Sequence, residues 1–174
     1  MKQTNLIALL SLILSIPVLA NDHHGHGHRH DPVNMPGLQG KDTQPIEVED
    51  LKTLFRRHPQ IKRDVTLLFN GVQTTTESDN PDVRTAIVRH VSMMVGRLES
   101  GQNPEVIIQS PTLDALFAVA ENIETQITPT AMGVRVTQTS RDAETVRLLQ
   151  QHAGEVSEMA AQGMHAVHRR MMGH

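Results

Sequence analysis

Five of the eleven histidines lie in the stretch ANDHHGHGHRHD, which runs from Ala20 to Asp31. Neutral imidazole binds zinc, copper and nickel, and histidine-rich tracts are typical of metal-binding segments. Glycine and histidine offer little that can pack, so we expect a disordered arm here. The run is interrupted by Gly and Arg, unlike the consecutive histidines of a purification tag. The candidate metal ligands of this arm are His23, His24, His26, His28 and His30.

The residues before the arm are typical of a secretory signal peptide. Lys2 supplies a short positive region, and an apolar run follows from Leu6 to Ile16. This run is shorter than the roughly 20 apolar residues that span a membrane. Val18-Leu19-Ala20 places small side chains where signal peptidase cleaves. We expect export to the periplasm and no membrane anchor once residues 1–20 are removed.

Cleavage after Ala20 would create an unusual chelating terminus. The mature chain would begin Asn21-Asp22-His23, which offers an amine, two backbone amides and an imidazole. Four nitrogens in one plane suit Cu(II) or Ni(II). The alternative is that His23 simply begins a polar spacer.

Composition excludes several classes of function. The chain has no Cys, so disulfides, thiolate metal sites and ordinary c-type haem attachment are not available. A formal charge of −3 and an aromatic content of 2%, with no Trp or Tyr, give no basis for binding nucleic acid. No nucleophile–base set or phosphate loop stands out, and Ser78 and Ser140 are better interpreted as helix caps. We therefore do not expect an enzyme.

The remaining chain contains an internal repeat. When the chain is shifted against itself without gaps, Phe55 aligns with Phe117, Gly71-Val72 with Gly133-Val134, and His90 with His152. Each unit is predicted to be a helix, a short strand and a second helix. The predicted helices cover 47–69, 81–99, 112–128 and 142–170, with Pro59 kinking or splitting the first. The predicted strands cover 72–76 and 134–139, which are rich in β-branched residues.

These elements predict a mainly all-α fold. Two equivalent strands are expected to pair antiparallel about a pseudo-twofold axis beneath a four-helix bundle. The domain organisation would be a signal peptide (1–20), a His-rich arm and linker (21–45) and a bundle domain (46–174). The repeat units would cover about 47–100 and 111–170.

Histidines of the predicted bundle form a second candidate metal site. His90 and His152 occupy equivalent positions beside the apolar stripes of the second and fourth helices. Met94 follows His90 by one helical turn, and His58 lies at the expected kink. A set of His58, His90, Met94 and His152 mixes imidazole with soft thioether and so favours copper. The alternatives are a buried structural histidine pair and axial ligation of haem by His90 and His152.

The C-terminal residues GMHAVHRRMMGH combine His165 and His168 with methionines, a mixture that suits Cu(I). The alternative is an amphipathic helix end whose methionines pack on the bundle.

Together these patterns predict an exported periplasmic metal-binding protein, most simply for copper, in metal tolerance, storage or delivery. Zinc and nickel are the nearest alternatives. Its partners would be metal ions and a periplasmic metal donor or acceptor protein. The other function classes are a helical periplasmic chaperone or stress protein and a bis-His haem-binding domain.

Overall fold

The computed structural model describes residues 35–173. The histidine arm and the predicted signal peptide lie outside the described residues. Short 3₁₀ helices cover Pro36–Leu38, His58–Gln60 and Ala120–Asn122. The α-helices and strands, in chain order, are α1 (Pro45–Arg56), β1 (Lys62–Leu68), β2 (Gly71–Glu77), α2 (Pro81–Glu99), α3 (Pro111–Ala118), β3 (Glu124–Pro129), β4 (Gly133–Thr139), α4 (Ala143–Gln162) and α5 (Met164–Met171).

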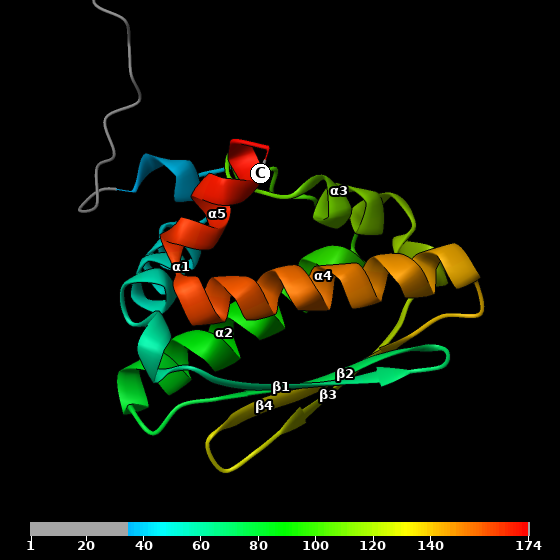
Figure 1. Cartoon of the computed structure of the whole chain (residues 1–174), viewed down its shortest axis with the longest axis horizontal. Coiled ribbons are helices and arrows are strands. Elements are labelled where there is room, and N and C mark those ends of the chain that lie inside the picture. Colours follow the sequence, from blue (N-terminus) through cyan, green and yellow to red (C-terminus); the bar gives the residue numbers. More distant parts are fainter. Residues whose placement is uncertain (1–34, 174) are drawn as a thin grey trace, which may run out of the picture. The chain divides into compact units, whose positions relative to one another are not determined.

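The four strands form one antiparallel sheet in the order β1-β2-β4-β3. The helices lie on one face of this sheet (Figure 1). The opposite face carries polar side chains in register, such as Arg135 beside Thr75 and Thr137 beside Gln73. Among the described residues, no helix covers that face.

The prediction of an all-α four-helix bundle with a two-stranded pair is wrong. The protein is an α+β fold, in which β2 and β4 form the centre of the sheet and β1 and β3 form its edges. The segments 62–68 and 124–129, expected to continue the helices that begin near 47 and 112, are strands instead. A short amphipathic run satisfies either a helix or a strand pattern, and only pairing with β2 and β4 decides between them.

The local sequence of β1 agrees with this outcome. Pro59 lies in a 3₁₀ turn just beyond α1, where its ring cannot continue the helix. In the following strand Arg63 and Val65 face the helices, and Asp64 faces the open side of the sheet. Asn70 lies in the tight turn between β1 and β2, and Gly71, which pairs with Leu68, begins β2.

The two units match element by element at the spacing that aligns His90 with His152. The 3₁₀ turn at His58–Gln60 corresponds to that at Ala120–Asn122, and β2 corresponds to β4. The helix caps also correspond: Asn80 accepts from backbone N–H groups at the start of α2, and Asp142 does so for α4. Ser78 and Ser140, expected to be caps, are instead buried just before these residues.

The core consists of two clusters in which each unit's last helix packs on the other unit's hairpin. Ile87 of α2 packs with Val134 and Val136 of β4. Leu149 of α4 packs with Val72 of β2. The two units are therefore intertwined, since the helix of one unit buries its apolar face on the strands of the other.

The C-terminal helix expected at 142–170 is interrupted. Gly163 has φ +57°, a left-handed conformation that favours glycine, and it separates α4 from α5. A Cβ at this position would also lie 2.6 Å from Cδ2 of His58.

Candidate functional site

A cavity of about 300 Å³ lies between the sheet and the helices. It lies over the centre of the sheet, where Thr74 pairs with Val136, and α2 and α4 both contribute to its walls. Most of its lining is apolar. The polar residues among its lining include Arg63, Thr74, Thr76, His90, Gln138 and His152.

His152 projects from α4 and contributes to the cavity wall. Its Nδ1 atom is the only buried side-chain nitrogen or oxygen without a hydrogen-bond partner among the described residues. Glu155 Oε2 is 3.8 Å away, which is too far for a hydrogen bond. A buried imidazole nitrogen with no partner calls for an explanation, and a ligand that binds there is one.

The carboxylate of Glu155 accepts hydrogen bonds from groups other than His152. The hydroxyls of Ser110 and Thr112 each donate to its carboxylate at 2.6 Å. Burial alone would raise the pKa of Glu155, but the nearby His152 imidazole and these hydroxyl groups outweigh burial and lower the pKa to about 2. The carboxylate is therefore ionised and held at the N-terminus of α3, beside the cavity rather than among its lining residues.

His90 projects from α2 into the same cavity. Burial lowers its pKa below the usual value, since desolvation outweighs the attraction of Asp50 and Glu47, and His152 lowers the pKa further. The ring is consequently neutral at pH 7, which is the form that binds a metal.

The two carboxylates near His90 are paired with arginines. Asp50, 2% exposed, accepts from Arg89 Nε and Nη2 at 2.6 and 2.5 Å. Glu47 accepts from Arg97 Nε and Nη2 at 2.6 and 2.8 Å. These bidentate pairs hold α1 against α2 and so fix the helix that carries His90.

Met94 lies one turn after His90 on α2 and lines the same cavity. Its neighbour Met93 lines a different pocket. The structure therefore brings His90, Met94 and His152 to one cavity. Sequence reasoning missed Arg63 and Met159, which line it too; the alternation of β1 was the signal that could have revealed Arg63.

His58 lies apart from this group. Its Nδ1 donates to the carbonyl oxygen of Ala160 at 3.2 Å, which satisfies one of the last carbonyl groups of α4. It is not among the residues that line the cavity. His58 therefore stabilises the end of α4.

The other predicted ligands either are not among the residues that line this cavity or lie outside the described residues. His165 is exposed on α5, and His168 is half-buried on the same helix. Within residues 35–173, no group of three or more His, Asp or Glu side chains is arranged to hold a metal. The arm histidines His23, His24, His26, His28 and His30 fall in the part that the structure does not describe.

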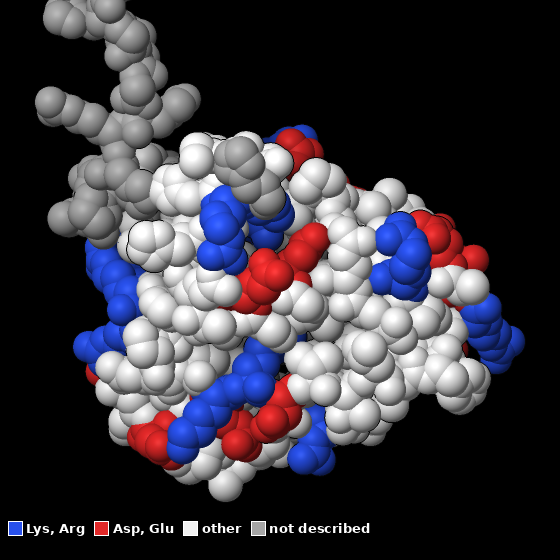
Figure 2. Space-filling model, viewed as in Figure 1, with Lys and Arg blue, Asp and Glu red and all other residues white. Residues whose placement is uncertain are grey.

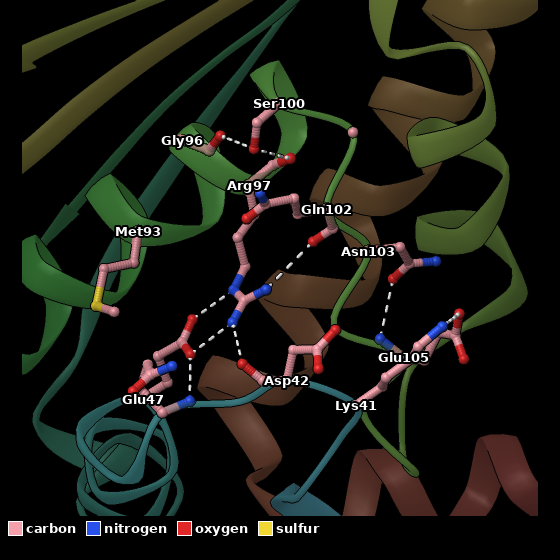
Figure 3. Close-up of a pocket in the computed structure, with 12 residues that line it drawn as sticks. Lys41, Asp42, Glu47, Met93, Gly96, Arg97, Ser100, Gln102, Asn103 and Glu105 are labelled. Atoms are coloured by element: carbon pink, nitrogen blue, oxygen red, sulfur yellow. Dashed lines mark hydrogen bonds and ion pairs between the residues drawn. The ribbon is translucent and has the colours of Figure 1, made fainter.

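A second pocket, of about 730 Å³, is polar and lies beside Arg97 (Figure 3). Arg97 donates to Glu47 and to the carbonyl oxygens of Asp42 and Gln102, so all three nitrogens of its guanidinium form hydrogen bonds (Figure 3). Met93 is also among the residues that line this pocket, and we propose no ligand for it.

Basic and acidic side chains are interspersed on the face of the molecule seen in Figure 2. No single-sign patch of the kind that attracts a polyanion is visible on that face of the described chain. No helix within residues 35–173 is long and apolar enough to cross a membrane.

Comparisons with protein-family models, with curated proteins and with solved structures give no match to this chain. Function must therefore be argued from the residues of the site.

Proposed function

We propose that this is an exported copper-binding protein of the periplasm, which captures the metal with its histidine arm and holds Cu(I) in the central cavity. The observation that supports the central site is the convergence of His90, Met94 and His152 on one cavity. Two imidazoles and a thioether form a soft ligand set, which favours Cu(I) over Zn(II). Metal tolerance, storage or delivery would each use such a site.

The charge of the cavity favours a monovalent metal ion. Within the described chain, no Asp or Glu is among its lining residues, and Arg63 and Arg170 already contribute positive charge. Neutral ligands in such surroundings supply no negative charge to balance the two positive charges of a divalent cation, whereas Cu(I) adds only one. The neutral state of His90 at pH 7 removes the need to displace a proton on binding.

The test is a Cu(I) titration of the mature chain under anaerobic reducing conditions, with a chromogenic chelator as competitor. The arm histidines are first replaced by Ala so that only the central site is counted. We expect one equivalent of tightly held Cu(I), which the pair of changes His90→Ala and His152→Ala removes. His165→Ala, on the exposed face of α5, is the control and should keep it.

The role of the Met94 thioether can be tested against its neighbour Met93, which serves as a matched control. Met94→Leu should weaken Cu(I) binding and remove the Cu–S signal from the X-ray absorption spectrum. Met93→Leu should change neither, because Met93 faces the other pocket. If the arm-substituted chain held no Cu(I), or if both methionine variants behaved alike, the central copper site would be disproved.

A bis-His haem site is the second candidate, and the apolar lining of the cavity favours it. His90 and His152 come from helices related by the pseudo-twofold axis, as axial ligands from two sides of a macrocycle would. Addition of haemin gives the discriminating observation. A six-coordinate Soret band that disappears in both His90→Ala and His152→Ala supports haem over copper.

A further inference from the structure

Arg63 is a partly buried arginine that has no acidic partner among residues 35–173. It extends from β1 toward α4, where Nε donates to Ser157 Oγ at 3.3 Å and Nη1 donates to Thr76 Oγ1 at 2.6 Å. Both acceptors are neutral hydroxyls. By contrast, Arg89 and Arg97, which also join internal elements, each have a carboxylate in bidentate contact.

The charge of Arg63 is uncompensated within the part of the chain that the structure describes. Burial lowers the pKa of its guanidinium to about 10, and no acidic group of the described residues opposes this effect. The side chain nevertheless stays protonated at pH 7. Buried charges are normally paired, because desolvation of a lone charge costs several kcal/mol. An arginine also has five N–H donors in a planar fork, which matches a carboxylate.

The rest of the cavity wall is largely hydrocarbon. Side chains from both units surround the space next to Arg63, including Leu54, Phe55, Val91, Val95, Leu113 and Val156. All six are only partly buried. A volume of about 300 Å³ is at the lower end of the range for small-molecule sites. The chemistry of the wall fits an apolar ligand, and the chemistry of Arg63 fits one anionic group on it.

We propose that the cavity binds an amphipathic monocarboxylate of the medium-chain fatty-acid type, with its carboxylate on Arg63 and Thr76 and its alkyl chain along the aliphatic walls. This inference concerns the same cavity as the proposed copper site, but it depends on Arg63 and Thr76 rather than on the copper ligands His90, Met94 and His152, and it does not rest on copper binding. A fatty-acid ligand would bury its chain as apolar side chains do and would supply the counter-charge that the described residues do not give to Arg63.

The test uses the mature protein, free of added metal, and isothermal titration with decanoate and with decanol. Decanoate should bind, and decanol, which has the same chain without the charge, should bind at least about tenfold more weakly, as expected for a hydrogen-bonded charge pair. Arg63→Gln should reduce decanoate binding to the level of decanol. Arg63→Lys should restore part of it, because the charge returns without the fork. Arg135→Gln, on the open face of the same sheet, is the control and should bind decanoate normally.

Stability gives an independent readout that separates a ligand-binding arginine from a structural one. Arg63→Met removes a partly buried charge that no carboxylate of the described chain offsets, so the ligand-free variant should have a higher urea midpoint than the parent protein. The same variant should gain no stability from decanoate, whereas the parent protein should gain. Equal binding of decanoate and decanol, unchanged decanoate binding by Arg63→Gln, or a lower midpoint for ligand-free Arg63→Met would each overturn the proposal.

Discussion

Thr74 of β2 lies directly opposite Val136 of β4, which is its own equivalent in the second unit of the repeat. The antiparallel register continues symmetrically on both sides, with Gly71 opposite Thr139 and Glu77 opposite Gly133. A pseudo-twofold axis therefore passes through the sheet at this pair. The cavity, with His90 on one side and His152 on the other, lies above the same point. The site is thus built where the two copies of the unit meet.

Because the helices are exchanged between units, neither unit should fold by itself. Residues 35–101 and 102–173, produced as separate chains, lack the strands on which their long helices pack. We expect each fragment alone to be largely unfolded as a monomer and an equimolar mixture to regain cooperative unfolding. Far-UV circular dichroism and sedimentation measure both properties. A monomeric fragment that unfolds cooperatively by itself would contradict the intertwined arrangement.

The two central strands depend on a glycine at the start of each. A Cβ at Gly71 would lie 2.0 Å from the carbonyl oxygen of Gln138, and one at Gly133 would lie 2.1 Å from that of Thr76. Gly71→Ala and Gly133→Ala should each destabilise the protein by about 1–3 kcal/mol, because backbone must move to make room. Urea denaturation measures the loss.

The control for this comparison is Gly154→Ala. Gly154 lies within α4, and a Cβ there would meet nothing within 4 Å in the described chain. This change should stabilise by about 0.5–1 kcal/mol, since alanine is the better helix former. Tolerance of alanine at the two strand positions would mean that β2 and β4 do not approach as closely as described.

The helix pairs of the two units use different chemistry at equivalent positions. Asp50 and Arg89 form an ion pair between α1 and α2, and the corresponding residues Thr112 and Gln151 form a neutral hydrogen bond of 2.7 Å between α3 and α4. The double change Asp50→Thr and Arg89→Gln would therefore replace the ion pair of the first unit with the neutral Thr–Gln hydrogen bond of the second.

We expect this double variant to be more stable than the single variant Arg89→Gln, which leaves the carboxylate of Asp50 buried without its guanidinium partner. Thermal unfolding of the single and double variants measures the coupling. If the effects of Asp50→Thr and Arg89→Gln were additive, the two side chains would not be acting as a pair.

We expect His90 to make the folded protein less stable as the pH falls. Its pKa is lower in the folded protein than the unfolded value of about 6.5, so the unfolded state binds the proton first as pH falls. His90 therefore has no effect on the free energy of unfolding above about pH 6.5. Below that pH, its effect lowers the free energy of unfolding by at most about 1.4 kcal/mol per pH unit. The groups that face His90 are Asp50 and Glu47 on α1 and His152 on α4.

Urea unfolding at pH 7.5, 6.5 and 5.5 measures this slope. His90→Gln should flatten the curve between pH 6.5 and 5.5, whereas His165→Gln on the exposed face of α5 should leave it unchanged. An identical slope in the parent protein and in His90→Gln would show that the folded state does not resist protonation at this position.

The amino-acid sequence by itself determined the duplication and much of the local structure. The identities at one constant spacing, such as Gly71 with Gly133 and His90 with His152, report the repeat directly. The β-branched residues of β2 and β4 and Pro81 at the start of α2 are signals contained within a few neighbouring residues. Such signals act locally, so they can be recognised without knowing what packs against them. The arm histidines, from His23 to His30, are likewise a prediction from composition alone.

The tertiary structure decided the rest. Whether Lys62–Leu68 is helix or strand depends on hydrogen bonds to β2, and the edge strand β3 depends on β4 in the same way. The exchange of α2 and α4 between units is a matter of packing between residues far apart in the sequence, such as Ile87 with Val134. That exchange leaves a cavity between two separate cores and directs Arg63 into it. The residues near Arg63 in the sequence do not reveal that it lacks an acidic partner in the described fold. Whether a charged side chain has such a partner depends on all the elements that surround it in space.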